Sequence, residues 1–259
     1  MIRTSVIIPC RNLEEADRCA EKCLNMTYDN LEVIVLPDRL DNFIWWENNL
    51  KTVPTGKVLP SHKRDIGVDN ATGDIIAFID ADAYPEKNWL TRAVQILVEQ
   101  GHRLGGVCGP GIIPPGSKFK EFAADEVLKM FPYNYRVTGQ FERLVDDYPT
   151  FNLILWKKYI DRVGGFNCDY LTGEDTLLCK KITHGLKKPI LYTPSVIVYH
   201  DRRPLFWPFL KQIATYGKHR GYFFKMYPET SRKLVYALPS IGVICLLSLL
   251  AYWAWCWLS

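Results

Sequence analysis

Short apolar runs alternate with amphipathic stretches from the start of the chain. Residues 4–9, 31–36 and 75–79 are apolar runs with the length and composition of strands buried on both faces. Residues 13–26 lie between the first two runs, with apolar side chains at helical spacing and acids in the first turn. A strand, a helix and a strand of these lengths predict two parallel strands joined by a crossover helix. The pattern therefore predicts an α/β fold with a mostly parallel central sheet flanked by helices.

The same alternation continues to residue 200. A loop rich in proline and glycine at 110–116 follows one of the later apolar runs, and loops of this kind often carry function. The stretch 43–53 is aromatic and amide-rich, and no element is predicted for it. Elsewhere we expect helices at 61–70, 89–100, 118–135 and 176–182, and strands at 106–109 and 190–200.

The composition is that of a packed globular protein. Of 259 residues, 48% are hydrophobic and 23% are charged, which allows one large domain or two small ones. The net charge of +4 is too small to indicate a nucleic-acid partner, so none is expected. The eight cysteines form no C-x-x-C pair and no zinc set with nearby histidines, which predicts reduced thiols in a reducing compartment. Met1 leads straight into the first apolar run, so we expect no signal peptide.

The composition changes after residue 201. Residues 202–233 hold eight Lys and Arg, interleaved with aromatic residues, and a single acid. The stretch 234–259 carries no charge and is longer than the roughly 20 residues that cross a hydrocarbon core. Three tryptophans near its end are typical of the aromatic belt at a membrane interface. We expect a transmembrane helix whose basic side faces the cytoplasm, with a buried core helix as the alternative.

Two carboxylates follow the third apolar run. Asp80 and Asp82 lie two positions apart where the predicted strand 75–79 ends. Side chains two apart on an extended segment point the same way, so both can converge on one hard cation. The alternative is an ordinary polar turn, since aspartate is common in turns. The pair is therefore a candidate site for a divalent cation.

Further polar residues follow the other predicted strands. Asn12 comes after the first strand, Asp38 after the second, Glu174 and Asp175 open a later helix, and His200 ends the last strand. An α/β sheet binds ligands beyond the carboxyl ends of its strands. A cation there would offset the charge that builds on a departing diphosphate. A carboxylate across the site could remove a proton from an attacking hydroxyl.

Several short motifs stand in a fixed order along the chain. They are Ser5-Val-Ile-Ile-Pro9 with Asn12, Arg64-Asp65-Ile66-Gly67, Gly73-Asp74 through Asp80-Ala81-Asp82, Gly164-Gly165-Phe166, Gly173-Glu174-Asp175 and His200. In this order and spacing the chain resembles glycosyltransferase family 2 over residues 3–220. The resemblance implies the GT-A fold, a nucleotide-sugar donor, a divalent cation (Mn²⁺ or Mg²⁺) and inversion of the anomeric centre.

The resemblance also implies which residues hold the nucleotide. Pro9, Arg11, Asn12, Asp38 and Arg64 would bind the nucleotide-sugar. Asp38 would hydrogen-bond the base, and Arg64 would lie beside the base and the diphosphate. Because both resemble residues around a uracil, a UDP-sugar is favoured over GDP-mannose or a dTDP-sugar.

The metal and the catalytic base are implied in the same way. Asp80 would lie near the ribose or the metal, and Asp82 would ligate the metal. His200 would reach the metal or the diphosphate, with a hydrogen-bonded histidine at a strand end as the alternative. Asp175 would be the general base, and Glu174 would help to position the acceptor or the base.

The chain departs from the family pattern at three places. Arg11 stands where the family often has tyrosine, although a guanidinium can also stack on a base. Residues 37–40 read Pro-Asp-Arg-Leu instead of the usual Asp-Asp-x-Ser. Residues 212–216 read Gln-Ile-Ala-Thr-Tyr, not the Gln-x-x-Arg-Trp of processive members, so we expect transfer of one sugar and no polymer extrusion.

The motifs and the tail together predict three parts. Residues 1–203 are the GT-A catalytic domain, 204–233 a basic and aromatic membrane-interface segment, and 234–259 a transmembrane helix or the start of a longer membrane region. In the middle part, the candidates for contact with acceptor or membrane are Trp207, Lys211, Lys218 and Arg220. The alternative for this part is a helix that packs on the catalytic domain and leaves a solvated basic face.

These observations predict an inverting, metal-dependent glycosyltransferase anchored in the membrane with its catalytic domain in the cytoplasm. It would move one sugar to a lipid-linked or cell-surface glycan acceptor. One alternative is a nucleotidyltransferase, which usually has a glycine-rich phosphate loop with a lysine near the first strand, unlike residues 9–13. Another is a catalytically inactive, membrane-anchored module that binds nucleotide-sugars.

Overall fold

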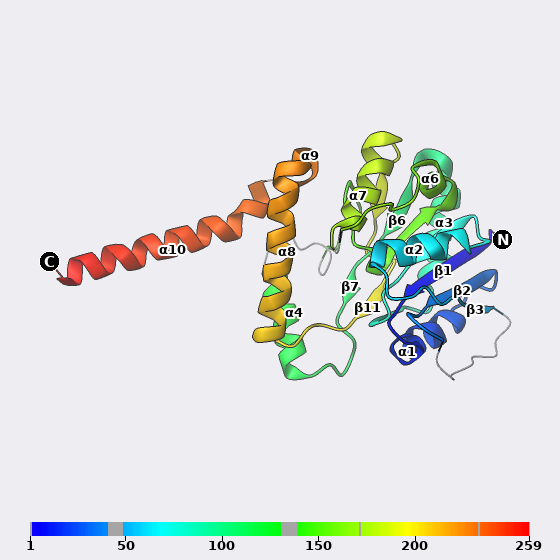
Figure 1. The fold of residues 1–259 in the computed structure, drawn as a ribbon, viewed down its shortest axis with the longest axis horizontal. Helices are drawn as coiled ribbons and strands as arrows, with labels where there is room; N and C mark the ends of the chain where they lie inside the picture. The colour runs from blue at the N-terminus through cyan, green and yellow to red at the C-terminus, as the bar shows by residue number, and fades with distance from the viewer. Residues whose placement is uncertain (1, 41–48, 131–138, 171, 233, 259) are drawn as a thin grey trace. The chain divides into compact units, whose positions relative to one another are not determined.

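The chain forms two compact units, Met1–Tyr216 and Gly217–Ser259. The structure, a computed structural model, describes residues 2–40, 49–130, 139–170, 172–232 and 234–258 (Figure 1). Most of the stretch 43–53 and the end of the helix predicted at 118–135 lie outside these residues. The first unit contains every residue of the predicted site except Lys218 and Arg220.

A mixed sheet forms the centre of the first unit (Figure 1). Within the described residues it has eight strands in the order β3-β2-β1-β4-β9-β6-β10-β8. Four of its seven strand pairs are parallel, while β9 runs antiparallel to both β4 and β6. The mostly parallel sheet is thus confirmed. The strands are β1 Thr4–Pro9, β2 Leu31–Leu36, β3 Leu50–Thr52, β4 Ile75–Phe78, β6 Gly106–Cys108, β8 Arg143–Val145, β9 Leu153–Trp156 and β10 Ile190–Tyr192.

Strand β1 sets the edge at which the site forms. It is parallel to β2 and β4, pairing Pro9 with Leu36 and Ile7 with Phe78. The carboxyl ends of these three strands therefore meet at one edge of the sheet. All three strands are buried along nearly their whole length, which accounts for their continuous apolar runs.

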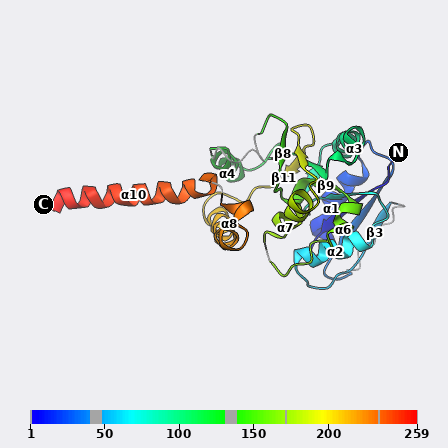
Figure 2. The same cartoon turned by 90° about the horizontal axis from the view of Figure 1, so that it is seen from above.

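Helices flank this sheet (Figure 1 and Figure 2). Helix α2 packs tightly against β1 and β2 because Gly67 has no side chain. A Cβ at Gly67 would lie 2.7 Å from Cγ2 of Ile7 and 2.9 Å from Cδ1 of Leu36. The close packing brings the first half of α2 to the ends of the strands. The flanking helices are α1 Leu13–Leu24, α2 Pro60–Asp69, α3 Trp89–Gln100, α6 Lys157–Arg162 and α7 Glu174–Lys180, and the first unit also contains α4 Phe119–Lys129.

A second, three-stranded sheet corrects one prediction. The stretch 190–200, predicted as a single strand, forms two: β10 in the central sheet and β11 Val198–His200 in the small one. In the small sheet β11 lies between β5 Ala83–Pro85 and β7 Gly111–Ile112. It is antiparallel to β5 and pairs His200 with Ala83. This register, and not the central sheet, places His200 beside Asp82.

The C-terminal helices begin with α8 Trp207–Met226, followed by α9 Pro228–Ser231 and α10 Leu234–Leu258. Residues 236–257 of α10 have a mean hydropathy of 1.9 and none of that window is buried. The helix is therefore long and apolar enough to cross a membrane. Its assignment as a transmembrane span stays a prediction.

Candidate active site

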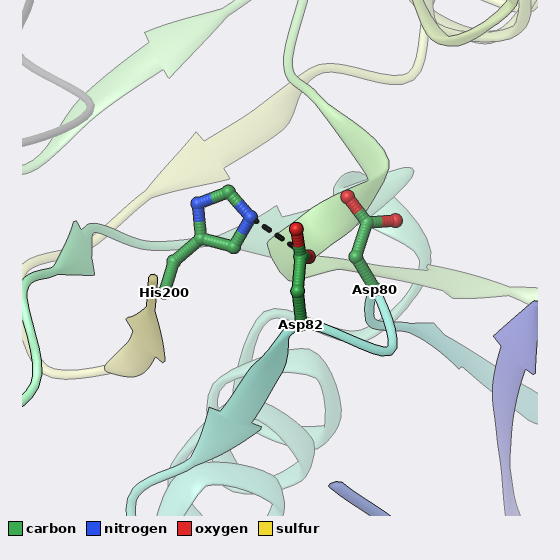
Figure 3. A group of neighbouring side chains, drawn as sticks. All are labelled: Asp80, Asp82 and His200. Carbon is green, nitrogen blue, oxygen red and sulfur yellow. Dashed lines mark hydrogen bonds and ion pairs between the residues drawn. The ribbon is translucent and has the colours of Figure 1, made fainter. Parts of the chain in front are cut away.

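Three side chains of the types that bind metals meet beyond the end of β4. Asp80 lies in the turn after β4, where its carbonyl accepts a hydrogen bond from the Ala83 amide at 3.0 Å, and Asp82 immediately precedes β5. His200 Nε2 lies 3.2 Å from Asp82 Oδ1 (Figure 3). One ligand atom from each of Asp80, Asp82 and His200 lies within 4.8 Å of the others. The structure thus brings together three residues that the sequence placed in separate motifs.

This group has the chemistry of a divalent-cation site. Carboxylate oxygens suit Mg²⁺ and Mn²⁺, and imidazole is a common ligand for transition metals. Desolvation opposes ionisation of Asp82, but the hydrogen bond and charge of His200 and the charge of Arg203 outweigh it and lower the pKa of Asp82. Asp82 is therefore ready to act as an anionic ligand. The residues present fit one divalent cation held by two carboxylates and one imidazole.

Arg64 forms ion pairs with two carboxylates of the site, Asp80 and Glu174. Its buried guanidinium donates from Nη2 to Asp80 Oδ1 at 3.0 Å and from Nη1 to Glu174 Oε1 at 2.9 Å. Burial raises the pKa of Glu174, against the opposing charge of Arg64. Arg64 thereby fixes the first turn of α7 beside Asp80. Its contact with base and diphosphate stays a prediction.

Asp175 follows Glu174 in the first turn of α7. Its Oδ1 accepts a hydrogen bond from the Thr176 amide at 2.8 Å. The Thr176 hydroxyl donates in turn to the buried Asp147 at 2.9 Å. These contacts hold the turn that carries Asp175, and through Arg64 that turn lies at the same sheet edge as Asp80.

The predicted nucleotide residues lie at the ends of β1 and β2. Pro9 ends β1, and Asn12 caps α1 by accepting a hydrogen bond from the Glu15 amide at 3.0 Å. The exposed Arg11 forms an ion pair with Glu15. Lys63 forms an ion pair with Asp38, with 2.6 Å between Lys63 Nζ and Asp38 Oδ1. Their contacts with a nucleoside stay predictions.

Sequence reasoning missed the way in which α2 organises the site. Lys63 donates to the carbonyls of Cys10 and Leu36 as well as to Asp38, which ties the ends of β1 and β2 together. The signals in the sequence were the basic residues at 62–64 and the motif Arg64-Asp65-Ile66-Gly67, and neither identified these partners.

Asp65, on the same helix, fixes the loop that leads to Asp175. Its carboxylate accepts hydrogen bonds from the amides of Phe166 at 2.8 Å and Asn167 at 2.9 Å. One turn earlier, the Ser61 hydroxyl donates to the carbonyl of Cys168 at 2.8 Å. Helix α2 therefore holds the loop before α7 through Ser61 and Asp65, and it holds Asp80 and Glu174 through Arg64.

Two neighbouring glycines in this loop should differ in how much an alanine substitution destabilises the protein. Gly164 and Gly165 both have positive φ, at 73° and 67°, but only Gly165 lies against Asp65. A Cβ at Gly165 would lie 2.4 Å from Asp65 Oδ1, whereas one at Gly164 would meet nothing within 4 Å. Gly164→Ala should lower the free energy of unfolding by about 1 kcal/mol through backbone strain. Gly165→Ala should lower it by about 1–3 kcal/mol more, because the collision must move Asp65.

Urea denaturation of the two glycine variants in mild detergent would measure this difference. Gly164→Ala is the matched control, since it carries the backbone strain without the collision. Equal loss of stability in both variants would show that Asp65 does not hold the loop as described.

His200 has a supporting environment that the sequence did not reveal. Its ring stacks on Phe151 with centroids 5.1 Å apart, and its Nδ1 lies 3.4 Å from Arg202 Nη1. Arg202 donates from Nε to the buried Asp125 of α4 at 2.7 Å. These partners lie up to 75 residues away in the sequence.

The predicted acceptor or membrane residues all lie on α8. Trp207 and Lys211 are exposed and stand one turn apart in the first unit. Lys218 is exposed and Arg220 is partly buried, both in the second unit. Their roles stay predictions.

Comparison with known proteins decides the family. The model of the family described as "Glycosyl transferase family 2" matches residues 48–182, which is more than half of the chain. The chain belongs to glycosyltransferase family 2. The matched region includes Arg64, Asp80, Asp82, Glu174 and Asp175. This family 2 protein is therefore an enzyme, a glycosyltransferase that uses a nucleotide-sugar donor.

Curated relatives are similar over most of the chain. A dolichyl N-acetyl-alpha-D-glucosaminyl phosphate 3-beta-D-2,3-diacetamido-2,3-dideoxy-beta-D-glucuronosyltransferase from Methanococcus voltae is 26% identical, over 84% of this chain and 72% of its own. The pre-mycofactocin glycosyltransferase of Mycobacterium tuberculosis is 25% identical over 89% of this chain. The chain spans about half of that relative's length, 49%.

Solved structures share the GT-A fold. The mannosyltransferase PcManGT from Pyrobaculum calidifontis, in complex with GDP-Man and Mn²⁺, superposes with a TM-score of 0.62 at 19% identity, over 87% of this chain and 64% of that one. TarS from S. aureus, in complex with UDP-GlcNAc, gives 0.55 at 17% identity, over 81% and 61%. The predicted fold class is thereby confirmed.

Proposed function

We propose that this enzyme is an inverting, metal-dependent glycosyltransferase that moves one sugar from a UDP-sugar to a lipid-linked or cell-surface glycan acceptor at the cytoplasmic face of a membrane. One observation carries the proposal. Asp80, Asp82 and His200 gather beyond β4, and Arg64 connects Asp80 to the first turn of α7, which carries Asp175. This arrangement supports a cation site and a separate carboxylate base at one sheet edge.

The donor's diphosphate would bind beside the three metal-ligating side chains. Asp82, Asp80 and His200 would hold a divalent cation, Mn²⁺ or Mg²⁺. Such a cation supplies positive charge that stabilises a departing diphosphate. The Mn²⁺ in the complex of the mannosyltransferase PcManGT supports this assignment.

Asp175 would act as the general base. It would take the proton from the acceptor hydroxyl while that oxygen attacks the anomeric carbon from the side opposite the diphosphate. One displacement of this kind inverts the anomeric centre and needs one base. Glu174, buried against Arg64, would keep the turn that carries Asp175 in place.

The nucleoside would bind at the ends of β1 and β2. Pro9, Arg11, Asn12 and Asp38 stand at this edge, and Lys63 already fixes Asp38. A UDP-sugar is favoured by the resemblance of Asp38 and Arg64 to residues around a uracil. The complex of TarS with UDP-GlcNAc is consistent with this choice, whereas PcManGT binds GDP-Man, so the donor screen includes both nucleotides.

The acceptor would be membrane-bound or surface-exposed glycan. Residues 1–203 would form the catalytic domain, 204–233 the membrane-interface segment and 234–259 the transmembrane helix, with the basic side in the cytoplasm. The apolar residues 236–257 of α10 support the anchor. The name of the Methanococcus relative, which includes a dolichyl N-acetyl-alpha-D-glucosaminyl phosphate, supports a lipid-linked acceptor.

A donor screen tests the proposal. The chain in detergent is incubated with UDP-, GDP- and dTDP-sugars, a lipid-phosphate acceptor and either Mg²⁺ or Mn²⁺, and release of nucleoside diphosphate is measured. We expect release with a UDP-sugar that stops when EDTA is added. Release of pyrophosphate would indicate a nucleotidyltransferase. Calorimetric binding of UDP with no sugar release from any donor would indicate an inactive binding module.

A further inference from the structure

Helix α4 exposes large aromatic side chains that have no role in the proposed reaction. Phe119 is 82% exposed and Phe122, one turn later, is 48% exposed. Exposed aromatic rings grouped on one helix face mark an interaction site more often than chance exposure does. Two residues hold α4 to the rest of the unit: Ala124, roughly opposite the two rings, is fully buried, and Asp125 is 1% exposed and pairs with Arg202. The aromatic face is therefore fixed and directed outward.

The same part of the first unit contains a second exposed apolar group. The amide of Leu205 donates to the carbonyl of Lys120 at 2.9 Å, which joins α4 to the segment before α8 (Figure 1). The sequence neighbours of this pair are Phe119 on one side and Phe206 and Trp207 on the other. Phe206 and Trp207 are 66% and 76% exposed. The hydrogen bond thus joins two exposed aromatic groups in one region, which we call the α4–α8 surface.

Phe206 holds a strained backbone at this surface. Its φ is 82°, a conformation that residues with side chains rarely adopt. Strain of this kind persists where the surroundings enforce it, and it is concentrated at functional positions. The left-handed backbone at Phe206 therefore accompanies an aromatic ring that is largely exposed at this surface.

The charges around the α4–α8 surface are unbalanced. Lys118, Lys120 and Lys211 are exposed, and among the residues that the structure describes none of them forms an ion pair. The exposed acid of α4, Glu126, is paired with Lys129 at 2.7 Å. Aromatic rings between unpaired lysines match a surface that is apolar inside and anionic outside.

We propose that the α4–α8 surface docks on an anionic lipid bilayer, so that the catalytic unit contacts the membrane through Phe119, Phe122, Phe206 and Trp207. The inference rests on the membrane placement in the proposed function, because the chain leads from this surface into the apolar helix α10. Aromatic rings enter the headgroup region and lysines pair with lipid phosphates. The docked surface is connected to the site, because Arg202 contacts both Asp125 of α4 and His200.

Site-directed fluorescence quenching tests the docking. The accessible thiols Cys168, Cys245 and Cys256 are replaced by alanine, and one fluorescent label is placed through Phe119→Cys. The full chain is reconstituted into phosphatidylcholine vesicles with one third phosphatidylglycerol. Val98→Cys is the matched control, because Val98 is a 52% exposed apolar residue on the helix α3. In a separate variant that keeps the native Cys245 of α10 and replaces only Cys168 and Cys256, a label on Cys245 reports insertion of that helix.

We expect nitroxide-bearing lipids to quench the label at 119 several-fold more than the label at 98, and iodide in the water to do the reverse. Quenching at 119 by iodide alone would overturn the proposal. Protection at 119 from both quenchers would also overturn it, in favour of a protein cover. Lipid quenching at 245 without quenching at 119 refutes only the docking surface. Absence of lipid quenching at both refutes the membrane placement in the proposed function as well.

Discussion

Asp82→Ala is expected to lower kcat/KM for sugar transfer by about 10³-fold or more, since a catalytic cation contributes several kcal/mol of charge stabilisation. The fold should survive, because the Asp82 side chain is 55% exposed and its partner His200 is also held by stacking on Phe151. The loss should appear both as weaker, cation-independent donor binding and as a lower kcat, because the cation would act on the bound donor and on the departing diphosphate. Steady-state kinetics across a Mn²⁺ titration, with thermal unfolding of the same samples, would measure both effects.

Asp201→Ala is the matched control for this substitution. The Asp201 amide donates to the Asp82 carbonyl at 3.2 Å, but its side chain is 51% exposed, pairs with Arg18 at 3.6 Å and is not one of the three grouped ligands. It should keep nearly full activity, as surface ion pairs contribute little. Near-normal turnover of Asp82→Ala, or equal losses in both variants, would contradict the metal assignment.

Asp175→Asn is expected to lower kcat by about 10²–10⁴-fold, the usual contribution of a general base. Asparagine keeps the shape of the side chain and an oxygen for the Thr176 amide, so the turn of α7 should persist. Donor binding should be unchanged, because in the proposed mechanism the diphosphate would be held by a cation on Asp80, Asp82 and His200, not by Asp175. Single-turnover kinetics and calorimetric donor binding would separate the two quantities.

Asp161→Asn is the matched control, because it makes the same aspartate-to-asparagine change outside the site. Asp161 is 50% exposed on α6 and pairs only with Lys157 among the described residues. Its substitution should leave both donor binding and transfer intact. If Asp175→Asn transferred sugar at the wild-type rate, the base would have to be another residue, and Glu174 would be the next candidate.

The local elements near the site could be predicted from the sequence. β1, β2 and α3 begin and end at the predicted residues. Buried parallel strands are continuous apolar runs, and an amphipathic helix shows its period within two turns. The carboxyl edge of the sheet, with Asp80 and Asp82 beyond β4, followed from these elements because parallel strands end together.

The pairing between distant segments could not be predicted. The single strand expected at 190–200 is wrong, because β10 joins the central sheet and β11 pairs with β5 in a different one. The contact of His200 with Asp82 spans 118 residues and depends on that register. No local periodicity encodes which sheet an apolar segment joins, so only the motif order placed His200 near the site.

The ion pairs inside the site were also beyond local reasoning. Arg64 was expected to contact the nucleotide, yet its buried guanidinium lies between Asp80 and Glu174. The sequence shows that Arg64 is a basic residue on a predicted helix. Which acids it pairs with depends on how α2 packs on the strands, and the sequence does not show that packing. Gly67 makes that packing possible, and a glycine within a predicted helix gave no sign of it.

Calorimetry of donor binding tests the central claim most directly, that Asp80, Asp82 and His200 hold a cation for the diphosphate. The wild-type chain is titrated with UDP in the presence of Mn²⁺ and again in the presence of EDTA, and Asp82→Ala is treated in the same way. We predict that Mn²⁺ tightens UDP binding by about tenfold or more, or at least about 1.4 kcal/mol, and that the alanine variant loses this gain. Equal affinity of the wild-type chain with Mn²⁺ and with EDTA would contradict the account.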